Sequence, residues 1–278
     1  MKIAVTGSCG FIGSHLVKRL AQLGTQVVEI DITKGIDVSD WQQLEKADEF
    51  DLLFHLAAKS YVPDSYESPR LFYYSNIIGT LNALELCRIR KAQMVYVSSY
   101  VYGRPKYLPI DEKHPVSAFN PYAQTKIIAE QLCQAYNRDF ALPVVIVRPF
   151  NIYGPGQNEN FLIPTIIRQV KTGKVVLKDP RPKRDFLFVD DFIELLFKLI
   201  DYDKKDYACF NAGSSESFSI KQLVDIINDI SSIKFEVVFE NQQRKNEIMD
   251  TVADISKAKK ILNWRPKVTI KEGLQRLI

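Results

Sequence analysis

The chain has 278 residues, of which 46% are hydrophobic and 25% are charged, and its formal net charge is +4. These proportions are ordinary for a soluble globular protein and allow one large domain or two unequal ones. The charged residues are dispersed along the sequence, which argues against a nucleic-acid partner. No apolar run reaches membrane-spanning length, and the spacing of the three histidines does not fit a metal site. Four unpaired-looking cysteines and no cleavable signal pattern lead us to expect reduced thiols in the cytoplasm.

The first forty residues predict a β-α-β unit. An apolar strand over Met1–Thr6 runs into Gly7-Ser-Cys-Gly10-Phe-Ile-Gly13, a helical pattern covers Phe11–Leu23, and a strand over Gln26–Ile30 ends at Asp31. Glycines at a strand-to-helix turn let the backbone approach a pyrophosphate, which then binds the exposed N–H groups of the helix. Asp31 stands where an acid accepts hydrogen bonds from an adenosine ribose, and its charge favours NAD over NADP.

The chain up to Pro149 continues this alternation of strands and helices. We expect a brief strand at Ile36–Val38, a small helix over Trp41–Ala47, strands over Asp51–Leu56, Val95–Ser98 and Val144–Val147, and helices over Arg70–Lys91 and Tyr122–Phe140. The helix over Arg70–Lys91 is apolar on nearly every face, so both sides need cover. One side is expected on the sheet and the other against a second subunit.

After Pro149 the pattern changes to short helices separated by loops with proline and glycine. We expect a strand-helix unit over Phe186–Ile200 and a strand at Ala208–Asn211 to return to the main sheet, then a helix over Ile220–Ile230, a strand over Phe235–Phe239 and two terminal helices. The predicted fold is α/β, with a Rossmann-type doubly wound parallel sheet over residues 1–150, to which residues 186–211 return. Residues 151–185 and 212–278 form a smaller C-terminal substrate-binding region that closes over the cofactor edge.

Tyr122 and Lys126 are the candidate catalytic pair. Side chains four residues apart on a helix share a face, so the phenol and the ammonium should point into the same space. A neighbouring ammonium favours the phenolate and is expected to lower the pKa of Tyr122 toward neutrality. A tyrosine tuned in this way can take a proton from an alcohol. His55 is expected to be structural.

Taken in order, the motifs of the chain resemble those of the extended short-chain dehydrogenase/reductase family, specifically its NAD-dependent nucleotide-sugar epimerases and dehydratases. The matching segments are Thr6-Gly7-x-x-Gly10-Phe-Ile-Gly13, His55-Leu-Ala-Ala58, Asn76-x-x-Gly79-Thr80, Ser98-Ser-x-Val-Tyr-Gly103, Tyr122-x-x-x-Lys126, Arg148-Pro-Phe-Asn-x-Tyr-Gly154 and Arg184-Asp-Phe-x-x-Val-Asp190. They run nearly from end to end, and such a set in order is highly specific.

The resemblance implies a role for each matching residue. Tyr122 is implied as the acid/base, Lys126 as a ligand of the nicotinamide ribose, and Ser98 as the hydrogen-bond partner of the reacting sugar hydroxyl. The residues implied to bind NAD are Gly7, Gly10, Phe11, Ile12, Gly13, Asp31, Asp37, Val38, Leu56, Ala57, Ala58, Asn76, Tyr122, Lys126 and Pro149. Those implied to bind the substrate are Ser98, Ser99, Asn151, Arg184, Arg244, Glu247 and Thr251, with the two arginines on the diphosphate.

Within this family the sequence disfavours dehydration, because Ser99-Tyr100 stands where the 4,6-dehydratases carry an acidic pair. The expected reaction is NAD-dependent 4-epimerisation of a UDP-hexose or UDP-N-acetylhexosamine through a transient 4-keto sugar. Thr251 falls where some UDP-galactose epimerases carry a bulky tyrosine, which would leave room for an N-acetyl group. The alternative is NAD(P)H-dependent reduction of a nucleotide-4-keto-6-deoxysugar, since the short segment after Asp31 resembles such reductases.

A catalytically silent NAD(P)-binding regulator ranks below both enzymes, because Ser98, Tyr122 and Lys126 are all present. The resemblance also implies a homodimer, formed by the helices predicted over Arg70–Lys91 and Tyr122–Phe140. No metal is expected.

Overall fold

The computed structural model describes residues 1–202, 207–243 and 247–278, and the chain divides into two compact units. Unit 1 consists of Met1–Gly103, Pro115–Pro149 and Leu196–Phe210. Unit 2 consists of Arg104–His114, Phe150–Leu195 and Asn211–Ile278.

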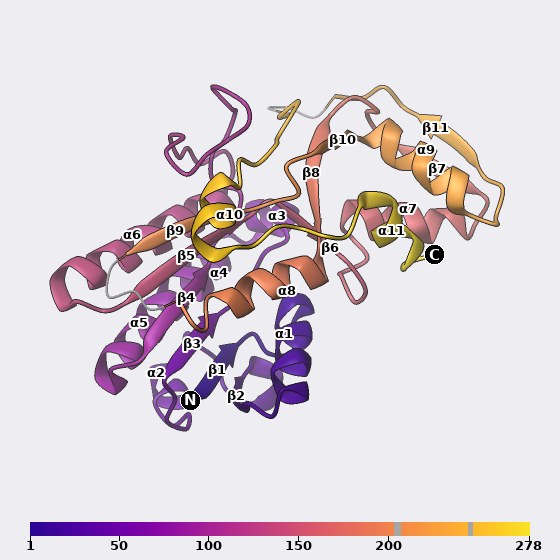
Figure 1. The fold of residues 1–278 in the computed structure, drawn as a ribbon. Coiled ribbons are helices and arrows are strands. Elements are labelled where there is room, and N and C mark those ends of the chain that lie inside the picture. The colour runs from indigo at the N-terminus through magenta and orange to yellow at the C-terminus, as the bar shows by residue number, and fades with distance from the viewer. Residues whose placement is uncertain (203–206, 244–246) are drawn as a thin grey trace. The chain divides into compact units, whose positions relative to one another are not determined.

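Unit 1 is built on a six-stranded sheet. Its strands are β1 (Lys2–Thr6), β2 (Gln26–Ile30), β3 (Leu52–His55), β4 (Gln93–Val97), β5 (Val144–Pro149) and β9 (Ala208–Ala212). They lie in the order β2-β1-β3-β4-β5-β9, and β1 to β5 run parallel (Figure 1). The helices are α1 (Phe11–Gln22), the 3₁₀ turn η1 (Ile32–Lys34), α2 (Trp41–Leu44), α3 (Val62–Glu67), α4 (Pro69–Tyr73), the π-helical turn η2 (Tyr74–Ile78), α5 (Gly79–Arg90) and α6 (Pro121–Phe140).

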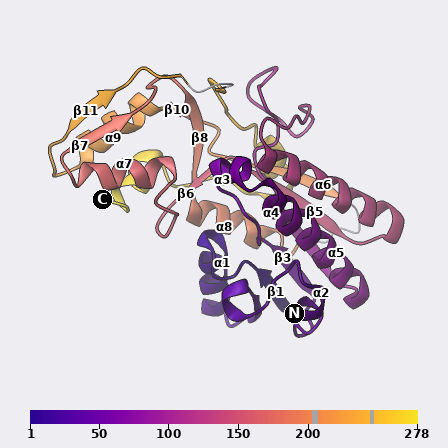
Figure 2. The ribbon, with the colours of Figure 1, turned by 180° about the vertical axis from the view of Figure 1, so that it is seen from behind.

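The inner strands of unit 1 are largely apolar, as expected where helices cover both faces of a parallel sheet. All six residues of β5 are buried. One face contributes Leu53, Tyr96 and Ile146 to a cluster that also holds Leu84 of α5 and Cys133 of α6. These two helices lie side by side (Figure 2). The predicted Rossmann-type parallel sheet is therefore confirmed.

Two local predictions in unit 1 are corrected. Residues 36–38, which the structure describes, form no strand; the chain instead turns through η1, where Asp31 caps the turn and Gly35 takes a φ of +83°. Short acidic and glycine residues favour such turns over extended chain. The helix predicted over Arg70–Lys91 begins at Pro69 and contains the π-helical turn η2 before α5.

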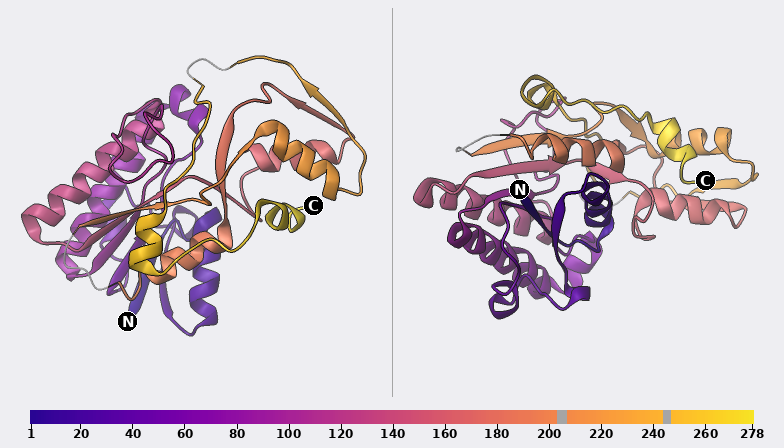
Figure 3. Two further views of the ribbon diagram at one scale, coloured as in Figure 1. Left: turned by 45° about the horizontal axis from the view of Figure 1, so that its top comes forward. Right: turned by 60° about the horizontal axis from the view of Figure 1, so that its bottom comes forward.

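Unit 2 holds two smaller sheets. Its strands are β6 (Asn151–Tyr153), β7 (Lys174–Leu177), β8 (Lys183–Phe188), β10 (Ser217–Ser219) and β11 (Glu236–Phe239). They form the sheets β10-β8-β6 and β11-β7. The helices are α7 (Leu162–Val170), α8 (Val189–Lys198, whose end belongs to unit 1), α9 (Ile220–Ile230), α10 (Ser256–Leu262) and α11 (Ile270–Gln275). α7, α9 and α11 pack against these strands (Figure 3).

The path of the chain between the units differs from the prediction. The strand at Phe186 belongs to β8, which pairs with β6 and β10 and does not return to the main sheet; from that segment the main sheet receives β9. Residues 104–114 belong to unit 2, because the backbone of Ile110 accepts from Asp254 and donates to Val252. Among the described residues, no helix combines the length and apolarity needed to cross a membrane.

Candidate active site

The carboxyl ends of β1 to β5 gather the candidate site residues of unit 1 along one edge of the sheet. Gly7 follows β1, Asp31 follows β2, Leu56 follows β3, Ser98 follows β4, and Pro149 ends β5. β2 and β3 lie on opposite sides of β1, so the chain reverses direction across the sheet at this point. Ligands of doubly wound sheets bind in the crevice outside such a switch point.

The glycine turn after β1 has room for backbone only. Gly7 has a φ of +67°, and a Cβ there would lie 2.9 Å from the backbone of Ala57. A Cβ on Gly13 would lie 1.9 Å from the Gly7 carbonyl oxygen. Within the described residues no side chain caps α1 at Gly10, so the N–H groups of its first turn, from Phe11 onward, suit an anion. The turn therefore fits a dinucleotide pyrophosphate.

The Asp31 carboxylate, beside that turn, is fixed by hydrogen bonds. It accepts from the Cys9 N–H at 3.0 Å, the Thr33 N–H at 2.9 Å and the Thr33 hydroxyl at 2.8 Å. Burial opposes ionisation, but the hydrogen bonds from Thr33 and Cys9 hold the pKa of Asp31 below its ordinary value. A carboxylate oxygen has more than one lone pair, so the anion can still accept from ribose hydroxyls. Asp37 has an analogous local bond, since its carboxylate accepts from Ser39.

The loop after β3 is shaped by buried polar side chains. The Thr6 hydroxyl accepts from the N–H groups of Leu56 and Ala57 at 3.1 and 3.2 Å. Asn76 is only 1% exposed, and its amide bonds the backbone of Lys59 and the Thr125 hydroxyl. Asn76 therefore fixes the loop that carries Leu56 to Ala58, and direct binding of the cofactor by Asn76 stays a prediction.

His55 is structural, as predicted. It is 1% exposed and hydrogen-bonds Thr6 and Thr80. Burial, assisted by the Lys126 ammonium, lowers the pKa of His55 to about 3, so the ring is neutral.

Tyr122 and Lys126 lie on the first turns of α6, which Asn120 caps by accepting from the Ala123 N–H at 2.7 Å. The Lys126 Nζ donates to the carbonyl of Val97 at 2.9 Å and so lies at the carboxyl end of β4. It also sits 4.8 Å from the centroid of the Tyr96 ring. The pair is thus brought to the same sheet edge as the glycine turn.

The expected lowering of the Tyr122 pKa is wrong for this structure. Burial raises the pKa of the Tyr122 phenol, and a hydrogen bond from Ser99 opposes that rise in part. Burial lowers the pKa of Lys126 to about 8, with the Glu130 carboxylate opposing the shift. The spacing argument missed that the Lys126 ammonium bonds a backbone carbonyl and that the phenol is desolvated.

Ser98 belongs to a buried polar network. It is 3% exposed, and its hydroxyl donates to Glu130 at 2.6 Å. Arg148 donates to the same carboxylate through Nε at 3.0 Å and Nη2 at 2.6 Å, and its Nη1 lies 3.2 Å from the Tyr102 hydroxyl. Sequence reasoning missed Glu130, although its position four residues after Lys126 on the same helix face was a usable signal.

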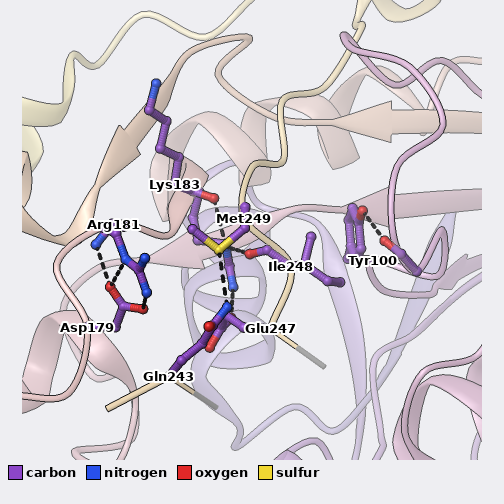
Figure 4. A network of polar contacts seen from close by, with 10 residues as sticks. Tyr100, Asp179, Arg181, Lys183, Gln243, Glu247, Ile248 and Met249 are labelled. Carbon is purple, nitrogen blue, oxygen red and sulfur yellow. Dashed lines mark hydrogen bonds and ion pairs between the residues drawn. The ribbon is translucent and has the colours of Figure 1, made fainter. Parts of the chain in front are cut away.

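Unit 2 carries the residues implied to bind the substrate. The Arg184 guanidinium donates to the carbonyls of Lys183 and Ile248 and pairs with Glu247 at 2.5 Å. Figure 4 shows these three partners, Lys183, Ile248 and Glu247. Arg184 and Glu247, both predicted substrate ligands, are therefore partners of one another here. Arg244 lies outside the described residues.

Two further predicted ligands in unit 2 have distinct surroundings. The Asn151 amide donates to the Asp185 carbonyl at 2.9 Å. Thr251 is 2% exposed, and within the described chain its hydroxyl and the Oδ1 of Asp250 are buried with no hydrogen-bond partner. Among the described residues, no group of three or more His, Cys, Asp or Glu side chains could hold a metal ion.

Comparison with known proteins gives a family model that matches residues 3–213, the NAD dependent epimerase/dehydratase family. The chain is 31% identical to the UDP-glucuronate 4-epimerase of Thermodesulfobacterium geofontis, over 99% of this chain and 94% of that protein. It is 29% identical to the GDP-6-deoxy-D-mannose reductase of Pseudomonas aeruginosa, over 100% and 96%. The crystal structure of the UDP-glucose 4-epimerase of Thermotoga maritima with UDP-glucose matches with a TM-score of 0.93 at 27% identity, over 99% and 97%.

Proposed function

Since the chain belongs to the NAD dependent epimerase/dehydratase family, we propose that it is an enzyme that epimerises a nucleotide sugar at C4. The substrate class is a UDP-hexose or a UDP-N-acetylhexosamine. The observation that carries the proposal is the position of Tyr122 and Lys126 at the sheet edge that also bears the uncapped glycine turn and the anionic Asp31. A tyrosine acid/base and a dinucleotide site at one edge suit oxidation and reduction of a sugar alcohol.

Each group of unit 1 has a task in this reaction. The glycine turn and Asp31 would hold NAD, which would accept a hydride in its oxidised form and donate one in its reduced form. Tyr122 takes the proton of the C4 hydroxyl as C4 is oxidised and returns it to the C4 oxygen as C4 is reduced from the opposite face. Tyr122 thus ends each cycle in its starting protonation state, and no net redox change occurs. The buried Lys126 ammonium supplies positive charge at the edge where the phenolate must form.

The substrate class is supported by unit 2. Arg184 is a guanidinium fixed by three acceptors, and the planar fork of arginine suits diphosphate oxygens. Thr251 is a small side chain with a buried hydroxyl that has capacity for a ligand hydrogen bond. Because Thr251 is small, we infer that the site has room for an N-acetyl group, and UDP-N-acetylglucosamine is the candidate substrate. Turnover of UDP-galactose with complete rejection of N-acetylated sugars would contradict that preference.

A second candidate is reduction of a nucleotide-4-keto-6-deoxysugar by NADH or NADPH. One observation favours it: the connection from β2 to β3 contains just η1 and the four-residue helix α2 in a stretch that the structure describes fully. A GDP-6-deoxy-D-mannose reductase is also among the relatives. The anionic Asp31 argues for NADH over NADPH in either reaction, because a 2′-phosphate would be repelled.

Proton NMR of the sugar anomeric signals separates these functions. The protein is incubated with UDP-, dTDP- and GDP-hexoses, first without reductant and then with NADH or NADPH. A new anomeric signal without reductant is the expected result, and Tyr122→Phe should abolish it. Consumption of reductant with 4-keto-6-deoxy sugars alone would establish the reductase instead. If the wild type changes no sugar and consumes no reductant in any of these assays, the binding-only role is supported.

A homodimer and a cytoplasmic location are also proposed. Leu71 of α4 and Tyr74 of η2 are 55% and 56% exposed, which is a large apolar exposure for one short segment. A second copy of this chain would cover it, and sedimentation at micromolar concentration should give a dimer; a monomer there would contradict the proposal. The four free thiols suit a reducing compartment.

A further inference from the structure

The Lys126 ammonium is buried, and the described residues give it a single hydrogen-bond acceptor. Its side chain is 3% exposed, and its Nζ donates to the Val97 carbonyl at 2.9 Å. An ammonium has three N–H donors, so this bond leaves two of them. Burying a charge without compensation is costly. The other groups around Lys126 therefore decide whether it stays charged and where its remaining donors point.

The ring of Tyr96 supplies a second contact for this ammonium. The Lys126 Nζ lies over the ring, 4.8 Å from its centroid. Tyr96 precedes Val97 on β4 and is 1% exposed. The face of an aromatic ring is electrostatically negative and attracts a cation, most strongly when both groups are shielded from water. Two successive residues of β4 thus offer Lys126 a carbonyl and a ring face, which leave an N–H for a ligand.

The orientation of the Tyr96 ring is fixed from the neighbouring strand. His55 of β3 lies opposite Tyr96 in the sheet, and the two rings stack with centroids 5.8 Å apart and an interplanar angle of 26°. His55 is hydrogen-bonded to Thr6 at 2.7 Å and to Thr80 at 3.2 Å. Since burial and the Lys126 charge lower the pKa of His55 to about 3, this stacked ring adds no positive charge.

We propose that Tyr96 is a positioning residue, whose ring face acts with the Val97 carbonyl to hold Lys126 as an ammonium and to direct its remaining N–H toward the nicotinamide ribose. The proposal rests on the proposed function, which gives the Lys126 charge its role beside Tyr122. Tyr96 acts through Lys126, because its own side chain is buried in the core beneath α5 and α6.

Matched variants at position 96 test the role of the ring. Tyr96→Phe retains the ring face, and Tyr96→Leu removes it. The pKa of Lys126 is followed by NMR of protein labelled with ¹³C at the lysine Cε, with Lys126→Met to identify the signal. We expect the pKa in Tyr96→Phe to stay within about 0.3 of the wild-type value, and the pKa in Tyr96→Leu to be lower by about 1, a tenfold loss of proton affinity. Equal pKa values in the three proteins overturn the proposal.

Two controls separate the ring from packing. Leu84→Ala changes another buried residue of the same core cluster, so it should lower the melting temperature and leave the pKa of Lys126 unchanged. Phenylalanine carrying one and then three ring fluorines at position 96 keeps the shape of the ring but weakens its negative face. The pKa of Lys126 should fall stepwise along this series. If Tyr96→Leu does not fold, a constant pKa along the series overturns the proposal.

The pH dependence of turnover gives a second readout. Burial lowers the pKa of Lys126 to about 8, while Glu130 and Cys133 on α6 oppose that shift and are unchanged in the variants. With a pKa lowered by about 1, Tyr96→Leu should match the wild-type kcat within about 2-fold at pH 6 and fall about 5-fold below it at pH 8, where less of its Lys126 is charged.

Two results of these assays have distinct meanings. A ratio of the wild-type kcat to the Tyr96→Leu kcat that is the same at pH 6 and pH 8 reports general damage to the fold and overturns the proposal. A wild type that turns over no nucleotide sugar defeats the proposed function, whereas the NMR titration still decides whether the Tyr96 ring holds the Lys126 charge.

Discussion

Both units bury charged side chains, but the buried charges differ in how many hydrogen bonds the protein provides to them. In unit 1 the Lys126 ammonium is 3% exposed and hydrogen-bonds one backbone carbonyl. In unit 2 the Asp185 carboxylate is 0% exposed and accepts from the backbone N–H groups of Ser214, Ser215 and Ala253 and from the Ser214 hydroxyl, all at 2.6–3.0 Å. Burial disfavours both charges, since it lowers the pKa of Lys126 to about 8 and raises the pKa of Asp185 to about 6. The two differ in their hydrogen bonds: Lys126 donates to one carbonyl, whereas Asp185 accepts from four donors.

We infer that the Lys126 charge serves the reaction, whereas the Asp185 charge stabilises the fold. A buried ammonium with few acceptors has a lowered pKa and costs stability at neutral pH. A buried carboxylate ringed by N–H donors joins the segments that carry them, here β8 to two stretches that lie 29 and 68 residues farther along the chain. Removing the first charge should therefore stabilise the fold, and removing the second should break it.

Asp185→Ala is the largest test of this contrast. It removes the acceptor of three backbone N–H groups that join separate segments of unit 2, so the free energy of unfolding should fall by about 3–5 kcal/mol, since each N–H left unsatisfied costs about 1–3 kcal/mol. The measurement is urea unfolding followed by tryptophan fluorescence, in which Trp264, 3% exposed, reports on unit 2. The control is Asp190→Ala in the same unit, whose ion pair with Arg276 is exposed and should be worth little. Equal stability of the two variants would contradict the architectural role of Asp185.

The same contrast explains how much of the fold could be read from the sequence. Unit 1 was predictable because its signals are local: apolar strands, a glycine turn and helical periodicity within about forty residues of one another. In unit 2, β8 was assigned to the wrong sheet because its partners, β6 and β10, are chosen by pairing across long stretches of chain. Residues 104–114 were assigned to the wrong unit because the backbone of Ile110 hydrogen-bonds to Val252 and Asp254. These partners are far away in the sequence, so no local pattern predicts the contact.

The candidate site was predictable in the same uneven way. The glycines and Asp31 follow from backbone geometry, which spacing encodes directly. The bonds of the Asn76 amide to Lys59 and Thr125 could not be predicted, because a motif does not reveal which protein groups a side chain contacts. The effect of Lys126 on Tyr122 was misjudged because desolvation depends on the packed surroundings, and no spacing between two residues reports it.

Lys126→Met tests the reactive side of the contrast. At pH 7 the variant should be about 1–3 kcal/mol more stable than the wild type, because the fold no longer carries a buried cation whose pKa is lowered from 10.5 to about 8. Activity should nevertheless fall by about 100-fold or more, since methionine cannot hydrogen-bond the nicotinamide ribose, the role predicted for Lys126.

The pH dependence supplies the sign of this effect. Between about pH 8 and 10.5 the folded wild type releases the Lys126 proton while the unfolded chain keeps it, so wild-type stability rises with pH. The advantage of Lys126→Met should shrink over that range. The exposed Lys18→Met serves as the control and should show no such trend. A Lys126→Met protein less stable than the wild type at pH 7 would mean that the ammonium is stabilising where it lies.

Asp31→Asn should have the smallest effect. It tests whether the hydrogen-bonded carboxylate of Asp31 in unit 1 serves to bind a ligand or to stabilise the fold. Asparagine can still accept from the Thr33 N–H, so η1 should persist, but the charge that repels a 2′-phosphate is lost. The ratio of the NADP dissociation constant to that of NAD should fall by about 10-fold, or roughly 1.4 kcal/mol. Titration of both cofactors by calorimetry measures it. Asp37→Asn changes a neighbouring carboxylate that accepts from Ser39, and it should leave the ratio unchanged. If Asp31→Asn lowers the melting temperature sharply while the ratio stays constant, Asp31 resembles Asp185 in being architectural, and the division of buried charge between the two units does not hold.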